Sequence, residues 1–246
     1  MRNIFIFLVG ILISFQSIGQ TTIYLNEYRV PIQPNPTSPA SFFMIKTGNE
    51  LSELILTFTT DTVTVLQKRV DKNEQGIATK KIDTEYTNDG ALTTRTTKDL
   101  LTSTTTIETY FTDGILKSKK VTKSGTLIEE QYYDQDGQVL PKPTLTMPLP
   151  KGDMQGWFEY LNKNMKMPNE VKYSGLNETV YVKFEIDTEG AIKNIQVYNP
   201  EEVHPSISKE AVRLLLKYPH RWKPGTSNGE NAVMDMILPL RFKYGN

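Results

Sequence analysis

The sequence predicts an α+β protein in two parts, an all-β N-terminal region followed by a smaller α+β domain. Glycine-centred turns recur between Thr-rich alternating segments over residues 71–140. Beyond them, two amphipathic helical patterns flank one alternating hairpin, and a last alternating segment spans residues 232–242. We therefore expect a β-rich hairpin-repeat region over residues 20–140, a Pro-rich linker over 141–151 and a C-terminal domain over 152–246.

The composition narrows the function classes. The chain has 246 residues with 28 basic and 28 acidic side chains, so its net charge is zero, which argues against a general nucleic-acid or anionic-membrane binder. It has no cysteine, which excludes disulfides, thiolate metal sites, a cysteine nucleophile and a Cys-linked lipid anchor. Only His204 and His220 are present. We therefore expect no catalytic residue, no metal site and no cofactor.

The N-terminus has the pattern of an export signal, residues 1–19. Arg2 supplies a positive charge, an apolar run covers residues 4–15, and Ser17 and Gly19 precede a cleavage site before Gln20. The apolar run is about 12 residues long, against the ~20 that a membrane-spanning helix needs. We expect a cleaved signal and a periplasmic or cell-envelope location. The alternative is an uncleaved inner-membrane anchor.

Residues 21–70 alternate between β-rich runs and breaks. Strands are expected over residues 23–30, 41–45 and 54–66, where β-branched and aromatic residues are dense. Four prolines between residues 31 and 39 interrupt regular structure. This part of the chain carries no motif for chemistry.

Residues 71–140 form a degenerate repeat. Turns with Gly76, Gly90, Gly114, Gly125 and Gly137 suit hairpins that need positive φ, and one further turn is expected near Asp99 without a glycine. Aromatic residues precede several of the turns, and an aliphatic residue follows. The pattern resembles the MORN or YwqK-type repeat, which implies a sheet built one hairpin at a time. Such a sheet binds a partner or a glycan, or serves as a spacer, and we favour the spacer.

The segment between the two parts is rich in proline. Pro141, Pro143, Pro148 and Pro150 favour an extended polyproline conformation. At ~3.1 Å per residue this segment reaches roughly 35 Å. It is long enough to separate two domains and too short to cross an envelope.

Two helices are expected in the C-terminal domain. Asp153 is the expected N-cap of the first, and Ser206 or Ser208 that of the second. The first helix has an apolar stripe of Met154, Trp157, Phe158, Leu161 and Met165. The second has a stripe of Ile207, Ala211, Leu214, Leu215 and Tyr218, with Lys209, Glu210, Arg213 and Lys217 expected at the surface.

Three strands complete this domain. Residues 179–186 and 191–199 form a hairpin, with a bulge near Ile192. In the last strand the even-numbered residues from Ala232 to Phe242 share one apolar face. Pro239 cannot donate a ladder hydrogen bond, which predicts that this strand lies at the edge of the sheet.

The order of landmarks resembles the C-terminal domain of the TonB family. Lys166-Met167-Pro168 follows the first helix, Trp222-Lys223-Pro224-Gly225 follows the second, and Asn228-Gly229 precedes the last strand. The resemblance implies a three-stranded antiparallel sheet with two helices. It also implies a non-enzymatic protein that binds an extended segment of a TonB-dependent outer-membrane receptor. Trp157 and Trp222 are expected in the core.

An edge strand can accept such a segment by β-strand addition. The expected partner-binding residues are Val233, Met234, Asp235, Met236, Ile237, Leu238 and Arg241. We expect Met236→Pro to remove an edge donor and weaken binding. For Asp235 and Arg241 the alternative is that they are solvated charges that discourage aggregation.

The resulting hypothesis is an envelope protein in TonB-linked transmembrane transport. The alternative is an exported scaffold or interaction protein without energy coupling, favoured by the short apolar run and the short linker. Contact with the ExbB–ExbD complex requires that residues 1–19 are retained as an anchor. A homodimer through the edge strand is a further alternative. No nucleophile–base pair, metal-ligand spacing or phosphate loop indicates an enzyme.

Overall fold

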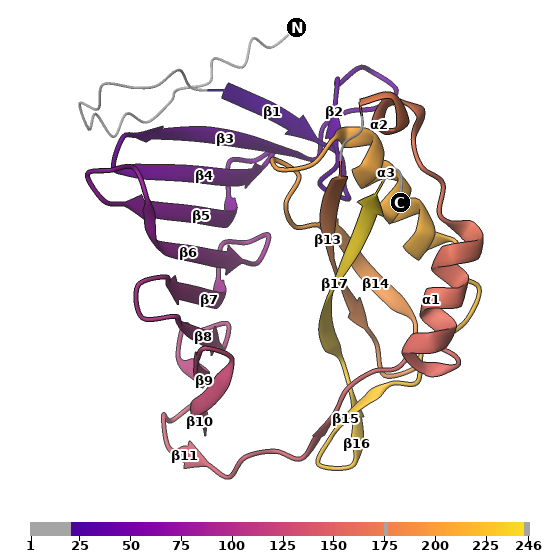
Figure 1. The fold of residues 1–246 in the computed structure, drawn as a ribbon. Coiled ribbons are helices and arrows are strands. Elements are labelled where there is room, and N and C mark those ends of the chain that lie inside the picture. The colour runs from indigo at the N-terminus through magenta and orange to yellow at the C-terminus, as the bar shows by residue number, and fades with distance from the viewer. Residues whose placement is uncertain (1–20, 175–176, 244–246) are drawn as a thin grey trace, which may run out of the picture.

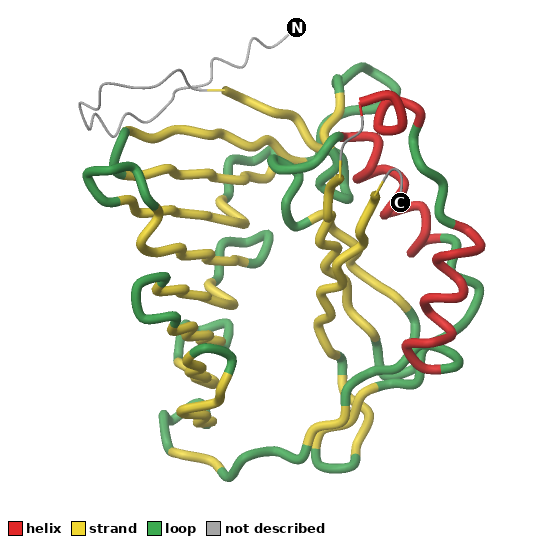
Figure 2. Tube along the Cα trace, viewed as in Figure 1, coloured by secondary structure: helices red, strands yellow, loops and turns green. Residues whose placement is uncertain are grey.

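The computed structural model describes residues 21–174 and 177–243, so the predicted export signal lies outside the described part. Figure 1 shows a tall stack of strands beside a more compact domain that contains the helices. In Figure 2 the helices are confined to the C-terminal part, where they cover one side of a small sheet. The α+β fold class is confirmed.

The N-terminal region is one antiparallel sheet of eleven strands. Its order is β11-β10-β9-β8-β7-β6-β5-β4-β3-β1-β2, so each strand from β3 to β11 pairs with its neighbour in the sequence. The strands are β1 (Thr21–Leu25), β2 (Pro31–Ile32), β3 (Phe42–Asn49), β4 (Ser52–Thr59), β5 (Thr64–Lys72), β6 (Ala78–Tyr86), β7 (Leu92–Asp99), β8 (Thr104–Tyr110), β9 (Leu116–Lys123), β10 (Thr126–Tyr133) and β11 (Val139–Leu140).

The predicted hairpin turns are present. Gly76, Gly90 and Gly114 have φ between 76° and 90°, in the left-handed region that glycine adopts without strain. The turn expected near Asp99 is also there: Asp99 Oδ1 accepts the amide protons of Leu101 and Thr102. Its residue with positive φ is Ser103, at 54°. The turn after Asp99 therefore forms a hairpin although it contains no glycine.

Most of this sheet is a single layer. Among the described residues of β6–β11, only Thr84 is fully buried. The apolar cluster of the sheet lies at its other end and consists of Leu25, Phe42, Met44 and Val65. Strands without a second layer depend on cross-strand side-chain pairs, such as Lys119 with Glu129 at 3.1 Å. The half-buried Thr and Lys ladders of β6–β10 follow from this arrangement.

The C-terminal part contains a second sheet with the order β14-β13-β17. The three helices are α1 (Asp153–Asn164), α2 (Asn169–Ser174), which was not expected, and α3 (Pro205–Leu216). The strands are β12 (Leu145–Thr146), β13 (Asn177–Ile186), β14 (Ile192–Val197), β15 (Gly225–Ser227), β16 (Glu230–Ala232) and β17 (Met234–Lys243). The register between β13 and β14 shifts near Asn194, which has φ 49°, so the expected bulge is present.

The core of this part is built around two tryptophans. Trp157 on α1 is 1% exposed and Trp222 is 2% exposed, as the sequence predicts. Their ring centroids lie 5.9 Å apart, and Phe184 of β13 lies 5.6 Å from Trp222. Aromatic pairs at these separations add to the free energy of burial. The core therefore joins α1, the sheet and the segment after α3.

Two expectations about the helix surfaces are wrong. Phe158 is 52% exposed, because the buried face of α1 passes through Trp157 and Leu161. Glu210 is buried rather than exposed. Its carboxylate accepts the amide proton of Lys166 at 2.7 Å and two hydrogen bonds from Arg213 at 2.6 Å. The ion pair with Arg213 lets Glu210 join α3 to the segment after α1.

The expected helix caps are also wrong. Gly152, with φ 74°, is the N-cap of α1, no side chain caps that end, and Asp153 is the first helical residue. At α3 the cap is His204, whose Nδ1 accepts the amide proton of Ser206 at 3.3 Å. Pro205 follows at the first helical position, where its missing N–H has no consequence.

The two parts touch at several points along the chain. In the proline-rich segment, β12 pairs with β15, and Leu149 bridges to Lys223. From the N-terminal region, Val30 is 1% exposed inside the C-terminal core, and the Val197 amide donates to the Tyr28 carbonyl at 2.9 Å. The segment expected to be an extended spacer is therefore paired at its far end. The domain boundaries remain a prediction.

One prediction follows from the turn between β13 and β14. Gly190 has φ 83°, and a Cβ added there would overlap the carbonyl oxygen of Trp222. We expect Gly190→Ala to lower the free energy of unfolding by about 3 kcal/mol, from left-handed strain and the steric overlap together. The measurement is urea unfolding of the full chain.

The matched control is Gly137→Ala. Gly137 has φ 76°, but nothing lies within 4 Å of an added Cβ. It should lose only the ~1–2 kcal/mol of left-handed strain. Equal losses at the two glycines would contradict the close approach of the Trp222 backbone to Gly190.

Candidate partner-binding edge

The last strand, β17, lies at one edge of the C-terminal sheet. It pairs with β13 from Asn177↔Lys243 to Ile186↔Met234 without a register shift. No strand pairs with its other side in the part of the chain that the structure describes. The prediction of an edge strand from Pro239 is confirmed.

The direction of each backbone group in β17 follows from its neighbour. The carbonyl of Tyr181 accepts from the Tyr198 amide at 2.9 Å, and the Tyr181 amide donates to Asn199 Oδ1 at 2.9 Å. Both groups of Tyr181 therefore point away from β17. Tyr181 stands opposite Pro239. In an antiparallel ladder this is a non-hydrogen-bonded pair, so the backbone groups of Pro239 point to the free edge.

Alternation extends this result along the strand. Asp235, Ile237, Pro239 and Arg241 direct their backbone groups outward, whereas the even-numbered residues bond to β13. The free edge therefore offers N–H donors at Asp235, Ile237 and Arg241, with a gap at Pro239. The expectation that Met236→Pro removes an edge donor is wrong, because the Met236 amide points to β13, opposite Phe184.

The side chains of six of the seven expected residues separate into two sets of three. Met234, Met236 and Leu238 are half-buried on the helix-covered face, where Met236 and Leu238 pack against the core. Asp235, Ile237 and Arg241 are exposed on the other face. The seventh, Val233, precedes the strand and is 58% exposed.

A cluster of charges lies between this exposed face and the N-terminal sheet. The Lys183 ammonium is 2.6 Å from a Glu85 carboxylate oxygen and 3.4 Å from one of Asp235. Burial lowers the pKa of Lys183, but the attraction of Glu85 and Asp235 outweighs it, and the pKa lies above its ordinary value. Lys183 therefore remains charged and joins β6 to both β13 and β17.

A second group of contacts joins the same two surfaces. Lys68 on β5 forms an ion pair with Glu201 at 2.7 Å, and both side chains are almost buried. The Tyr198 hydroxyl donates to Asp83 at 3.1 Å. No periodic pattern predicts these long-range pairs. The only sequence signal is the alternation of β6, which places Asp83 and Glu85 on one face.

A polar hollow of about 350 Å³ opens beside this cluster. It is lined by residues of β6–β7 and of the C-terminal sheet. Its charged lining residues are Arg29, Glu85, Lys183, Glu185 and Asp235, with one more carboxylate than cations. The start of β17 therefore borders a hollow with a small negative excess.

The opposite edge of the sheet is partly covered, at the Val197 end of β14. There, the Val197 amide of β14 donates a hydrogen bond to the Tyr28 carbonyl, and the nearby Val30 packs in the core. This contact occupies part of the β14 edge, whereas the outward backbone groups of β17 have no partner among the described residues.

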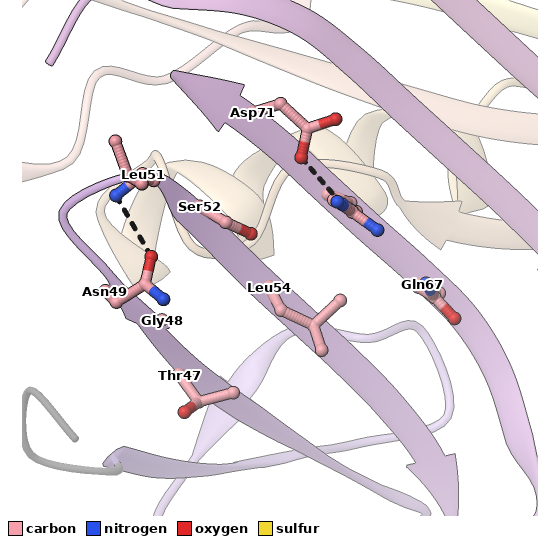
Figure 3. A pocket seen from close by; sticks show the side chains of 9 residues that line it. Thr47, Gly48, Asn49, Leu51, Ser52, Leu54, Gln67 and Asp71 are labelled. Carbon is pink, nitrogen blue, oxygen red and sulfur yellow. Dashed lines mark hydrogen bonds and ion pairs between the residues drawn. The ribbon is translucent and has the colours of Figure 1, made fainter. Parts of the chain in front are cut away.

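A hollow of about 560 Å³ lies on the N-terminal sheet at the β3–β4 hairpin, and Figure 3 shows side chains that line it. Its polar side chains pair locally: Asn49 accepts the Leu51 amide proton at 3.0 Å, and Arg69 contacts Asp71 at 2.6 Å. Ser52 stands opposite Asp71 in the β4–β5 ladder, but the Asp71 carboxylate is paired with Arg69, and the described lining residues include no histidine. It gives no indication of chemistry.

Neither histidine belongs to such a site. His204 caps α3, and His220 packs against Tyr218 with ring centroids 5.8 Å apart. Within residues 21–174 and 177–243, no group of three His, Asp or Glu side chains is placed to hold a metal ion. No helix in these residues is both long and apolar enough to cross a membrane.

Comparison with known families supports the predicted resemblance. Residues 163–244 match the family described as Gram-negative bacterial TonB protein C-terminal, which is about one third of the chain. The match begins in α1 and ends just after β17, so it includes the free edge. No curated protein was found to match the sequence. The resemblance of residues 71–140 to a MORN-type repeat stays a prediction.

The charge cluster predicts a loss of stability in alkali. Burial, with Glu85 and Asp83, raises the pKa of Tyr198 far above its ordinary 10.0. The unfolded chain ionises this tyrosine near pH 10 and the folded chain does not, so stability falls above that pH. Lys183 acts in the same direction: its pKa is raised, so its contribution is complete below about 10.5 and is lost as pH rises through the folded value.

Urea unfolding between about pH 8 and pH 11 measures this effect. We expect the loss above pH 10 to be steeper for the wild type than for Tyr198→Phe, by up to about 1.4 kcal/mol per pH unit. Tyr24→Phe, at a tyrosine that is 46% exposed, is the control and should follow the wild type. Parallel curves for Tyr198→Phe and the wild type would mean that Tyr198 is not buried against Asp83.

Proposed function

We propose, on the premise that residues 163–244 match the TonB C-terminal family, that this protein binds an extended segment of an envelope partner by strand addition to β17. The observation that carries the proposal is the outward direction of the backbone groups of Asp235, Ile237 and Arg241. An incoming strand would pair with these groups and extend the β14-β13-β17 sheet by a fourth strand.

Strand addition uses the main chain for affinity and side-chain contacts for specificity. Each backbone hydrogen bond gained contributes about 0.5–1.5 kcal/mol after the exchange with water. Pro239 removes one donor in the middle of the edge, which limits non-specific edge-to-edge pairing. The half-buried Met234, Met236 and Leu238 hold the strand against the helices. These three side chains would affect partner binding only through the position that they give to the β17 backbone.

The partner that the family suggests is a TonB-dependent outer-membrane receptor, through a segment near its N-terminus. The protein would then act in the cell envelope, in TonB-linked transmembrane transport, without enzymatic activity. Its partner-binding residues would be Asp235, Ile237 and Arg241, with Val233 at the start of the segment.

The second candidate is an exported scaffold or interaction protein without energy coupling. The contacts that attach the C-terminal domain to the preceding chain favour it: Val30 of the N-terminal region lies in the core, and β12 of the proline-rich segment pairs with β15. A domain held in this way is not carried on a long tether. Contact with ExbB–ExbD would require residues 1–19 as a retained anchor, and the N-terminal mass of the membrane-bound and soluble protein distinguishes the two candidates.

A proline at Ile237 tests strand addition directly. Ile237→Pro removes an outward donor but no bond to β13, so the domain should stay folded. Peptides from the N-terminal segments of outer-membrane receptors should bind the full-length variant about tenfold more weakly, because a hydrogen bond is lost and a partner carbonyl is left unpaired. Calorimetry or fluorescence anisotropy gives the affinity.

Two further variants serve as controls. Ile237→Val keeps the amide and should bind like the wild type. Met236→Pro interrupts the ladder to β13 and should reduce stability. Unchanged affinity in a folded Ile237→Pro variant would show that the edge of β17 is not where the peptide binds.

A further inference from the structure

The polar hollow beside the charge cluster is lined by an arginine whose charge is not matched. Arg29 lies between β1 and β2 and is only 6% exposed. Its Nε has no hydrogen-bond partner among the described residues. A buried donor without an acceptor is costly, and the cost is larger for a charged group. An acceptor on a ligand in the hollow would remove that cost.

The backbone on both sides holds Arg29 in this position. The Tyr28 carbonyl accepts the Val197 amide proton, and Val30 packs in the C-terminal core. Arg29 itself has φ 58°, which is strained for a residue other than glycine. Its guanidinium carbon lies 5.4 Å from the centroid of the Phe42 ring. The turn therefore fixes a buried guanidinium at the wall of the hollow.

The carboxylate that attracts Arg29 is shared with another cation. Glu85 favours the charged form of Arg29, but its carboxylate lies 2.6 Å from the Lys183 ammonium. Burial lowers the pKa of Arg29, and the attraction of Glu85 does not outweigh it. For Lys183 the attraction does outweigh burial, and the pKa is raised. Glu85 is therefore the partner of Lys183 first, and Arg29 is short of an anion.

The opposite imbalance occurs at the start of β17. Glu185 and Asp235 stand opposite each other in the β13–β17 ladder, where like charges repel. Lys183 is 3.4 Å from Asp235 but is closer to Glu85. Glu185 accepts a hydrogen bond of 2.7 Å from the Asn194 amide, which brings no charge. These two carboxylates are therefore short of a cation.

Both imbalances belong to the same hollow, and together they select a class of ligand. A simple anion on Arg29 would add to the excess of carboxylates, and a simple cation would leave Arg29 unmatched. A molecule with both charges meets both requirements. The volume of about 350 Å³ is at the small end of ligand pockets and suits a molecule the size of a dipeptide. The lining side chains of Asn88, Thr94 and Gln196 add amide and hydroxyl groups for its polar atoms.

We propose that this hollow binds a small zwitterion of dipeptide size, with its carboxylate on the Arg29 guanidinium and its ammonium beside Glu185 and Asp235. Arginine binds carboxylates through charge-assisted, often bidentate hydrogen bonds. The site uses the side chain of Asp235, whereas strand addition uses its outward backbone groups. The inference therefore does not depend on the proposed function.

Glycylglycine and two blocked forms of it test the site in the full-length protein. N-acetylglycylglycine keeps only the carboxylate, and glycylglycinamide keeps only the ammonium. We expect glycylglycine to bind with a Kd of about 1 mM and each blocked form about tenfold more weakly, because one charged side of the hollow is then left unmatched. Titration followed by NMR gives the affinities, and the amides of Thr94, Asn194 and Gln196 should shift.

Variants assign each charge to its side chain. Asp235→Asn, at a side chain that is 57% exposed, should weaken glycylglycine about fivefold and leave N-acetylglycylglycine unchanged. Arg29→Gln should weaken glycylglycine and leave glycylglycinamide unchanged. Asp136→Asn, at an exposed carboxylate between β10 and β11, is the matched control and should bind like the wild type. If Arg29→Gln does not fold, the blocked dipeptides and Asp235→Asn still decide.

The contrary outcomes are specific. Equal affinity of glycylglycine and either blocked form would overturn the zwitterion, since one of the two charges would then have no role. No binding of any of the three at about 10 mM would overturn the site. Shifts confined to the amides of Ile237 and Arg241 would place the dipeptide at the free edge of β17 and also overturn it. Each of these results would leave strand addition of a longer segment untouched.

Discussion

The ladder between β13 and β17 determines what this protein can offer to a partner. It holds β17 on one side through the backbone groups of the even-numbered residues, and their apolar side chains lie on the face covered by the helices. The odd-numbered residues are then left with their backbone groups outward. The backbone N–H and C=O of Tyr181 are both bonded on the β14 side, and this fixes which residues of β17 direct their backbone groups outward. The free edge, its charges and its proline gap all depend on the pairing.

A second constraint is the attachment of the N-terminal sheet. Over β6–β11 this sheet has almost no core, so it cannot gain much from burial of its own faces. The N-terminal region contacts the C-terminal domain through Val30 and through the ion pairs of Lys68 and Lys183, and the proline-rich segment adds the pairing of β12 with β15. Partly buried ion pairs contribute little net stability, but removing one partner leaves a charge uncompensated. They therefore define how the two surfaces meet more than they hold them together.

The sequence predicts the local features of this structure well. Turn glycines, the apolar stripe of α3 and the alternation of β17 are short-range patterns, and each appears as expected. The failures involve contacts between distant residues. Phe158 and Glu210 are assigned to the wrong environment because the facing element decides burial, not the period alone. The backbone groups of Ile237 point outward and those of Met236 do not. This depends on which backbone groups β13 directs toward β17, and the residue pattern of one strand does not contain that information.

The direct test of the account is amide hydrogen exchange of β17, residue by residue, in the full-length protein. The amides of Asp235, Ile237 and Arg241 should exchange rapidly in the free protein and become protected when a receptor-derived peptide is bound. Those of Met236, Leu238 and Leu240 should be protected in both states by their bonds to β13. Protection of Ile237 and Arg241 before any partner is added, or rapid exchange that persists in the complex, would contradict a free edge that accepts a strand.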